Sequence, residues 1–437
     1  METIYLNELI GNGYKPRKVG DKLREVVKGK IENEEEIFPE IYGLDREKRR
    51  IAEVLMTGKG ILLTGQYGTA KTEISKTVRK LLEEYHKKHE VFYPASCPVQ
   101  EEPFNIAYSL GIPEVKNNGY KLEDACPICR SNYCNGNKAD PKDIELLKFE
   151  KPVEGKGFAR VQSGSDVTPD EIIGTYNLTK LAELGDPFDP EVFQPGKIGQ
   201  ASGGILFVDE LGKLCESGQY ALIQASEEGS VTPSKSRETF PVDELLITTT
   251  NPIDEDNIIG AVFDRLVSIK VPIVGYEDEI KILEKSLEKK RYKNAPYVPK
   301  LFREVLVKTV RDIRKSNSEL EIGPRTSINA GLVARESAFY DGRTIANYCD
   351  VKEGLYTAVL GKSLFDDKED IEEAIKNNLP DISKYISEVF GDVDLENGKR
   401  NLFVNTVKKI ENFDEEKLDE LVEVYYQAYV KGCENDG

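Results

Sequence analysis

The stretch from Gly65 to Thr72 has the residue types and the spacing of a loop that binds phosphate groups. In such loops glycines let backbone N–H groups turn inward, a lysine reaches the β- and γ-phosphates, and a hydroxyl ligates Mg²⁺. The loop follows the apolar run 60–64 and precedes a helical pattern that starts at Lys71. This order of strand, loop and helix is the context that the motif requires. Its residues are Gly65, Gln66, Tyr67, Gly68, Thr69, Ala70, Lys71 and Thr72.

One position of this loop departs from the usual pattern. Ala70 stands where a glycine commonly precedes the lysine. A methyl group is tolerated there if the backbone φ is negative, as expected for a residue that enters a helix. The sequence therefore predicts a negative φ at Ala70.

Two carboxylates end a second apolar run. Residues 204–208 read as a parallel strand that is buried on both faces, and Asp209 and Glu210 follow directly. Ligands bind at the carboxyl ends of such strands, where one acid can hold Mg²⁺ and the next can polarise an attacking water. We assign these roles to Asp209 and Glu210 respectively.

Two further polar side chains are candidates for the same phosphate-binding site. The strand 245–250 ends at Asn251, which we expect beside the γ-phosphate. Arg325 follows Gly323-Pro324 at the start of a helix, where a cation is electrostatically disfavoured, so an anionic partner is expected for it.

Four cysteines form a candidate metal site. Cys126 and Cys129 have the spacing of a tight chelating turn, and Cys134 and the distant Cys97 complete four thiolates. Four sulfurs suit Zn²⁺ in a closed structural site, although an iron–sulfur cluster uses the same ligands and reduced thiols in a loop are a third interpretation. His86 and His89, the only histidines, are expected to face solvent.

The positions of these residues predict an α/β domain with a parallel sheet, followed by an all-helical domain. Residues 1–37 read as an N-terminal extension and 38–275 as the nucleotide-binding domain, with a cysteine-bearing insertion at about 97–157. Helical patterns at 276–291, 299–317, 324–340 and 348–364 make up the second domain, and 365–437 is an acidic helical extension. Ile41 and Tyr42 lie just before the phosphate loop, in a segment suited to pack on an adenine base.

Composition narrows the class of protein. The chain has 60 Lys and Arg against 78 Asp and Glu, a net charge of −18, which makes nucleic acid an unlikely ligand by bulk attraction to phosphates. No basic start followed by an apolar stretch and no membrane-length apolar run occur, so neither a signal peptide nor a membrane span is expected. We expect a cytoplasmic protein whose seven cysteines are reduced or bind metal.

Taken together, these motifs resemble those of AAA+ ATPases of the helix-2-insert group. The similarity is to the ATPase (I) subunit of magnesium chelatase and to MoxR-type ATPases, over about residues 38–360. Gly65–Thr72 resembles Walker A, Ile205–Glu210 Walker B, Thr248–Asn251 sensor 1, Phe263–Arg265 the arginine-finger segment and Gly323–Arg325 sensor 2. The segment Cys97–Pro103 with the Cys126/Cys129 pair also looks like the ATPase part of PrkA-type bacterial kinases.

The resemblance implies an ATP-hydrolysing motor with a P-loop AAA+ domain and a helical lid. Mg²⁺ is expected on Thr72 and Asp209, and the subunits are expected to form a homo-oligomeric ring, by resemblance a hexamer. Arg265 is then the finger that acts on a neighbouring subunit, and Arg325 the residue that senses the nucleotide. The motor either serves a metal chelatase, with a partner that carries an integrin-like (VWA) domain and metal insertion into a tetrapyrrole, or remodels a protein client in the manner of MoxR.

Overall fold

The fold was analysed in a computed structural model of the chain. It describes residues 3–115, 121–136, 138–164, 166–186, 189–233, 238–316, 322–346 and 348–359. The chain divides into two compact units, with the boundary between Pro272 and Ile273; the phosphate-loop residues Gln66–Thr69 group with the second unit. The expected extension at 365–437 lies outside the described residues.

A six-stranded, fully parallel sheet forms the centre of the first unit, in the order β13-β2-β12-β9-β6-β5. The strands β2, β12 and β9 are buried at every position, as their mainly apolar sequences predict, although β12 ends in three threonines. Their carboxyl ends therefore meet at one edge of the sheet. The strands are β2 (Ile61–Thr64), β5 (Val153–Glu154), β6 (Gly157–Gln162), β9 (Ile205–Asp209), β12 (Leu245–Thr250) and β13 (Val267–Lys270).

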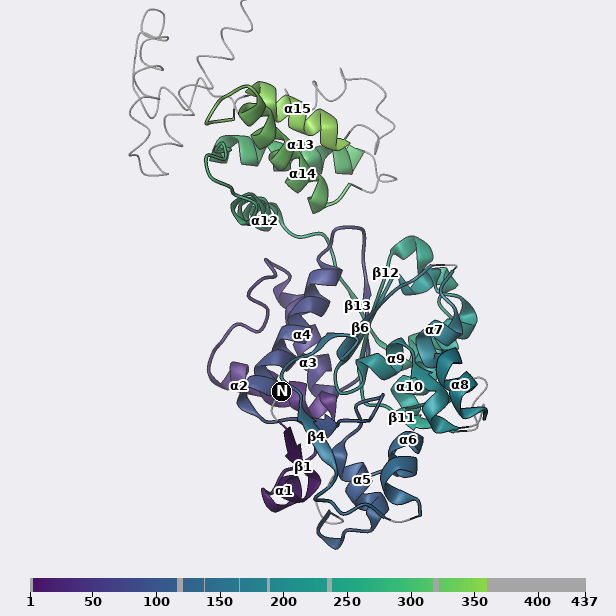
Figure 1. Ribbon diagram of the computed structural model, residues 1–437. Helices are drawn as coiled ribbons and strands as arrows, with labels where there is room; N and C mark the ends of the chain where they lie inside the picture. The colour runs from purple at the N-terminus through teal and green to yellow at the C-terminus, as the bar shows by residue number, and fades with distance from the viewer. Residues whose placement is uncertain are drawn as a thin grey trace, which may run out of the picture. The chain divides into compact units, whose positions relative to one another are not determined.

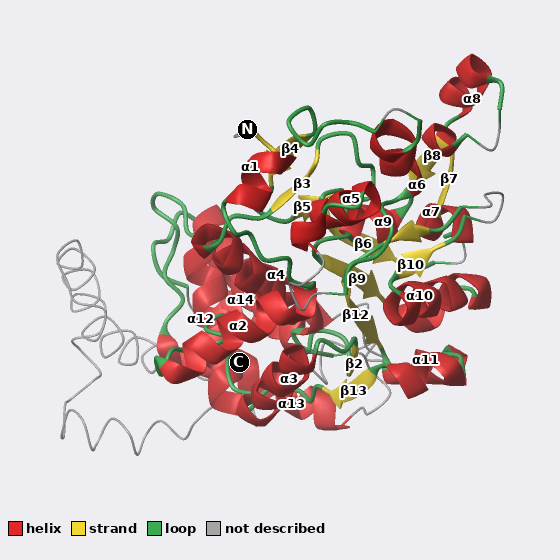
Figure 2. Cartoon of the chain, turned by 90° about the horizontal axis from the view of Figure 1, so that it is seen from below, coloured by secondary structure: helices red, strands yellow, loops and turns green. Residues whose placement is uncertain are grey.

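Helices cover both faces of this sheet, which gives a three-layer α/β fold (Figure 1). On one face α2 (Val19–Glu32), α3 (Asp45–Thr57) and α4 (Lys71–Lys88) pack on alternate strand residues such as Leu63 and Phe207. On the other, α9 (Lys197–Ala201) and α10 (Glu216–Glu228) pack on Leu206 and Leu246. Figure 2 shows the same division from below.

The N-terminal residues do not form the separate extension that the sequence suggested. Strand β1 (Thr3–Tyr5) pairs with β4 (Glu145–Lys148), which also pairs with β3 (Phe92–Pro94) in a small antiparallel sheet. Helix α1 (Leu6–Gly11) buries two leucines and α2 buries Leu23 and Val27 in the core. Residues 1–37 were predicted to be an extension, yet most of their apolar side chains pack in the core, whereas Tyr5 and Ile31 are exposed.

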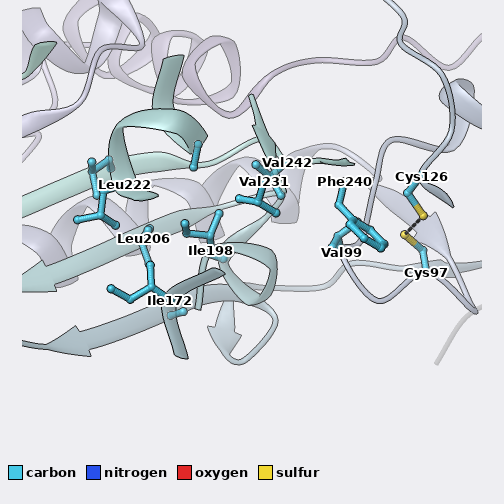
Figure 3. Packing of buried hydrophobic residues seen from close by; sticks show 14 of the residues in the cluster. Cys97, Val99, Cys126, Ile172, Ile198, Leu206, Leu222, Val231, Phe240 and Val242 are labelled. Atoms are coloured by element: carbon cyan, nitrogen blue, oxygen red, sulfur yellow. Dashed lines mark hydrogen bonds between the residues drawn. The ribbon is translucent and has the colours of Figure 1, made fainter. Parts of the chain in front are cut away.

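The cysteine-bearing insertion is built of short elements around this small sheet. Its helices are α5 (Pro103–Leu110), a 3₁₀ turn (Pro113–Val115), α6 (Pro127–Cys129) and a π-helical turn (Arg130–Cys134). Side chains of the insertion join the same core as the α10 face of the parallel sheet, as Figure 3 shows for Val99 beside Phe240. The insertion predicted at about 97–157 is therefore a set of short elements that pack on the core of the first unit.

Short elements also connect the strands elsewhere in the first unit. Two of them form a hairpin, in which β7 pairs antiparallel with β8. These elements are α7 (Pro169–Ile173), β7 (Gly174–Tyr176), α8 (Leu178–Leu184), a 3₁₀ turn (Pro190–Val192), β8 (Phe193–Pro195), a 3₁₀ turn (Leu211–Lys213), β10 (Ser230–Val231), β11 (Phe240–Pro241), a 3₁₀ turn (Pro252–Asn257) and α11 (Gly260–Arg265).

One histidine lies inside this unit, against expectation. His86, near the end of α4, is 6% exposed and its ring lies 4.8 Å from that of Phe149. Burial lowers the pKa of His86 to about 3, so the ring is neutral. The prediction that it faces solvent was wrong, because α4 is covered by Phe149 at this end.

The second unit contains the four helices expected from their apolar spacing. They are α12 (Tyr276–Lys289), α13 (Lys300–Ser316), α14 (Pro324–Tyr340) and α15 (Tyr348–Val359). They share one core, which includes Leu283, Phe302 and Leu355. Within it the buried Glu279 carboxylate accepts hydrogen bonds from the side chains of Arg311 and Arg314 at 2.8 and 3.0 Å.

Candidate nucleotide site

The phosphate loop has the conformation of an anion-binding turn. It begins where β2 ends and closes at Lys71, the first residue of α4. Gly68 adopts a left-handed φ of 80°, and the Thr69 hydroxyl donates to the Gln66 carbonyl at 2.9 Å. Backbone N–H groups at such a turn and at a helix N-terminus attract anions.

Ala70 also adopts a left-handed φ, of 65°, so the prediction of a negative φ was wrong. Ala70 is not the first helical residue but the N-cap of α4, and its backbone must turn before the helix begins. An alanine in this region costs about 1 kcal/mol relative to glycine. The loop is therefore strained at the position where its sequence is unusual.

Lys71 turns back over the loop. Its ammonium donates to the Gly65 carbonyl and, at 3.0 Å, to Oδ1 of Asn251. Asn251 follows β12 and is 3% exposed. Thr72 lies next to Lys71 in the first turn of α4. The structure thus brings the lysine of the loop to the end of a neighbouring strand.

Asp209 and Glu210 lie beside this pair, at the end of β9. The register of β12 and β9 sets Thr249 next to them, and its hydroxyl donates to Oδ1 of Asp209 at 2.6 Å. The same hydroxyl accepts from the Glu210 N–H at 3.0 Å. Thr249 therefore fixes both acids, a role that the sequence did not reveal although the residue stands in the segment that resembles sensor 1.

The Glu210 carboxylate is held on two sides. Asn251 donates to its Oε1 at 3.4 Å and Lys213 to its Oε2 at 3.1 Å. Asn251 consequently links Lys71 to Glu210, as one amide contacts both. Glu210 itself has a left-handed φ of 59°, which directs its side chain away from the strand course.

Strand β6 adds two residues that the sequence reading missed. Arg160 donates to Oδ2 of Asp209 at 2.5 Å, and Gln162 donates to Oε2 of Glu210 at 3.5 Å. The alternation of residues 159–162, with Ala159 and Val161 buried and Arg160 and Gln162 exposed, was the available signal for a strand ending at the same edge.

The donor set fits a nucleotide with Mg²⁺. The Arg160 guanidinium occupies the position beside Asp209 where a cation is favourable, and the side chain of Asp209 is 13% exposed. Carboxylate and hydroxyl oxygens are the ligands that Mg²⁺ prefers. Asp209 and Thr72 are the residues of this site that would supply them.

The segment expected to contact adenine is partly buried in the core. Ile41 is 4% exposed and packs in the cluster that contains Phe38, while Tyr42 is half-buried. Adenine contact by Ile41 and Tyr42 stays a prediction.

The two candidate arginines have different surroundings. Arg265, the last residue of α11, forms a 2.7 Å ion pair with Glu227 of α10 and also donates to the Ala261 carbonyl. Arg325, in the first turn of α14 within the second unit, is exposed. The roles predicted for them stay predictions.

Three of the four predicted cysteine ligands come together. Cys97, Cys126 and Cys129 lie with Glu101 in a buried group whose ligand atoms are all within 4.8 Å of one another, which we call the thiol–carboxylate cluster. Cys134 ends the π-helical turn, is only half-buried and is not part of the group. The fourth place that the sequence reading gave to Cys134 is thus taken by Glu101.

Comparison with protein families identifies the chain. Residues 8–315 match the family model described as the PrkA AAA domain. The chain belongs to the PrkA AAA-domain family. The match begins within α1. The N-terminal helices that pack on the sheet therefore lie within the region that matches the PrkA family model. Among the described residues of this PrkA-family chain, none of the helices is both long and apolar enough to cross a membrane.

The individual proteins that match this chain share 23–25% sequence identity with it. Magnesium-chelatase subunit ChlI of Nostoc sp. is 23% identical over 353 residues, which are 69% of this chain and 91% of that subunit. ChlI of Chlorella vulgaris is 23% identical over 256 residues, 55% of this chain, and the match spans only 58% of that subunit. The uncharacterized protein YeaC of Bacillus subtilis is 25% identical over 171 residues, 38% of this chain and 49% of YeaC.

Solved structures with related architecture include the Thermotoga maritima RuvB Holliday junction branch migration motor. It matches 91% of this chain and 91% of its own, with 13% identity and a TM-score of 0.39. The complex between subunits BchI and BchD of magnesium chelatase matches 78% of this chain and 98% of that chain, with 16% identity and a TM-score of 0.36.

Proposed function

We propose that this chain hydrolyses ATP and uses the turnover to remodel a partner. The observation that carries the proposal is the continuous set of hydrogen bonds from Lys71 through Asn251 to Glu210, with Asp209 fixed alongside by Thr249. A phosphate-binding lysine, a base and a metal-binding acid are the parts that phosphoryl transfer to water needs. Here they lie on adjacent strand ends of one sheet.

Each side chain then has a defined task. Lys71 and the N–H groups of the loop bind the β- and γ-phosphates. Thr72 and Asp209 would hold Mg²⁺, which neutralises charge on the phosphates when bound. Glu210 accepts the proton of the attacking water, and Asn251, which contacts both Lys71 and Glu210, orients the base toward the γ-phosphate.

The decisive experiment is Glu210→Gln. The amide keeps the shape of the side chain and removes the base, so ATP binding should persist while turnover falls by roughly 10²–10⁴-fold. Glu228→Gln, on the exposed end of α10, is the matched control and should leave turnover unchanged. Undiminished hydrolysis by Glu210→Gln would refute the assignment.

We further propose that the active form is a homo-oligomeric ring, with six subunits by resemblance, in which Arg265 acts on the site of a neighbour. The side chain of Arg265 is 33% exposed and forms an ion pair with Glu227, whose side chain is itself 47% exposed. A surface pair of this kind is weak and can be exchanged for a phosphate. A finger of this type contributes about 10³–10⁵ in rate.

Two variants of the same ion pair test this role. Arg265→Ala should abolish most turnover, whereas Glu227→Gln, which frees the guanidinium, should not. Mixed rings of Arg265→Ala and Lys71→Ala subunits should regain part of the activity, because intact sites then meet intact fingers. Equal losses from both pair variants, or no rescue in rings shown to be mixed, would exclude Arg265.

Arg325 is proposed to sense the bound nucleotide. It is an exposed cation in the first turn of α14, where the helix dipole disfavours positive charge and an anionic partner would offset that cost. Arg325→Ala should weaken discrimination between ATP and ADP in binding assays. Unchanged affinities for both nucleotides would show that Arg325 does not sense the nucleotide.

Two partner classes remain as candidates for this motor. The similarity to magnesium-chelatase ChlI over 353 residues favours the motor of a metal chelatase, with an integrin-like (VWA) partner and metal insertion into a tetrapyrrole. The alternative is that the motor remodels a protein client in the manner of a MoxR-like chaperone, without metal insertion. Affinity purification from the native cell separates the two: a large tetrapyrrole-binding subunit supports the first, and a lone VWA protein or another client the second.

A further inference from the structure

The thiol–carboxylate cluster is assembled from two turns that are far apart in sequence. Cys97 and Glu101 lie in the turn after β3. Cys126 is the N-cap of α6, and Cys129 is the last residue of that helix. Gln100, with a left-handed φ of 49°, reverses the chain just before Glu101. This reversal returns the carboxylate to the cysteine four residues earlier.

The separations within the cluster match those around a single tetrahedral ion. The sulfurs of Cys97 and Cys126 lie 3.8 Å apart and point toward one another (Figure 3). Four ligands at metal–sulfur distances of about 2.3 Å have sulfur–sulfur edges of about 3.8 Å. Oε1 of Glu101 lies 3.8 Å from the Cys97 sulfur, close to the sulfur–oxygen edge of about 3.5 Å in the same geometry.

Backbone N–H groups already point at the ligand atoms. The Glu101 N–H donates to the Cys97 sulfur and the Cys129 N–H to the Cys126 sulfur, both at 3.4 Å. The Cys126 N–H donates to Oε2 of Glu101 at 2.9 Å. Donors in this arrangement stabilise thiolates and a carboxylate and orient them as metal ligands.

The side chains of the thiol–carboxylate cluster are buried, and a bound cation would offset the cost of burying their charges. Cys126 and Cys129 are fully buried, and Glu101 is 3% exposed. Among the described residues, Glu101 forms no ion pair with a basic side chain, and an ionised carboxylate buried without one is costly. A divalent cation at the centre of the cluster would satisfy all four groups at once.

We propose that Cys97, Glu101, Cys126 and Cys129 bind one structural Zn²⁺ ion. Four protein ligands leave no open position, which is the mark of a structural site, and three thiolates select zinc over Mg²⁺ or Ca²⁺. Binding releases the thiol protons as the sulfurs become ligands.

The consequence of the site is a crosslink within the insertion. Zinc would join the turn after β3 to α6. The elements around these two segments, such as α5, are short. Such a crosslink accounts for a loop-rich region that keeps one conformation. Cys134, half-buried and outside the cluster, has no part in it.

The test is metal analysis of the full chain, purified without added metal, once in air and once anaerobically with reductant. We expect about one zinc per chain and little iron. Cys126→Ser should lose the metal, and Glu101→Gln should weaken zinc affinity in chelator competition by about 100-fold or more. Cys134→Ser is the matched control and should keep both zinc content and affinity.

Cobalt substitution reports the ligands directly, because the thiolate-to-cobalt absorption scales with the number of sulfurs. The wild type and Glu101→Gln should show the same thiolate absorption, and Cys129→Ser a weaker one. Glu101→Gln is nearly isosteric, and ATP binding shows that the variants are folded. Chains without zinc, iron–sulfur absorption in the anaerobic preparation, a Cys97–Cys126 disulfide that resists alkylation, or zinc lost on Cys134→Ser would each overturn the proposal.

Discussion

Glu244, just before β12, gives a quantitative prediction of stability against pH. Both of its carboxylate oxygens are buried and have no hydrogen-bond partner among the described residues. Burial raises the pKa of Glu244 to about 8 from its ordinary value of 4.5, and the neighbouring Asp243 carboxylate adds to the rise. The folded chain therefore keeps this carboxyl protonated in a range where the unfolded chain ionises it.

The sign follows from which state binds the proton. The contribution of Glu244 to the free energy of unfolding is fully present below pH 4.5 and is lost as pH rises toward 8. The loss is about 1.4 kcal/mol per pH unit, or about 3 kcal/mol at pH 7. Glu244→Gln, which is neutral and similar in shape, should not suffer it.

The assay is thermal unfolding of both chains from pH 4 to pH 8. The variant should match the wild type at pH 4 and exceed it progressively above pH 5, by roughly 6–12 °C at pH 7. Glu228→Gln, on an exposed glutamate of α10, should track the wild type throughout. A difference that does not change with pH would refute the reasoning.

Variants at His86, Arg160 and Ala70 test three further structural features. His86, whose pKa burial lowers to about 3, contributes stability that is present above its unfolded pKa of 6.5 and lost as pH falls toward 3, so His86→Phe should flatten the acid side of the thermal profile while His89→Gln should not. Arg160→Met removes the cation beside Asp209 and should strengthen Mg²⁺ binding about fivefold in titrations with nucleotide, a gain of about 1 kcal/mol; unchanged or weaker binding would mean that Arg160 does not compete with the ion. Ala70→Gly relieves the left-handed backbone and should raise the free energy of unfolding by about 1 kcal/mol, whereas Ala70→Val should lower it, as measured by denaturant titration.

The sequence predicted best what depends on neighbouring residues. The apolar runs that become β2, β9 and β12 stand out because both faces of each strand are buried. The helices of the second unit follow from apolar spacing and from Pro324 at a helix start. These signals are local, so no knowledge of the tertiary structure was needed to read them.

What the sequence did not reveal depends on contacts between distant segments. Arg160 reaches Asp209 only because β6 lies beside β9 in the sheet. Glu101 joins the cysteines through a reversal at Gln100, whereas spacing alone favoured Cys134. The φ of Ala70 was misjudged because its position relative to the first helical residue is set by the structure of the loop.

The pairing of β1 with β4 has a consequence for synthesis on the ribosome. Thr3 pairs with Leu147, so the first strand waits for about 140 residues before its partner is made. At 5–20 residues per second this interval is about 7–28 seconds, during which β1 presents unpaired backbone groups. The nascent chain therefore has a long window in which a chaperone, or a wrong strand, can bind its first residues.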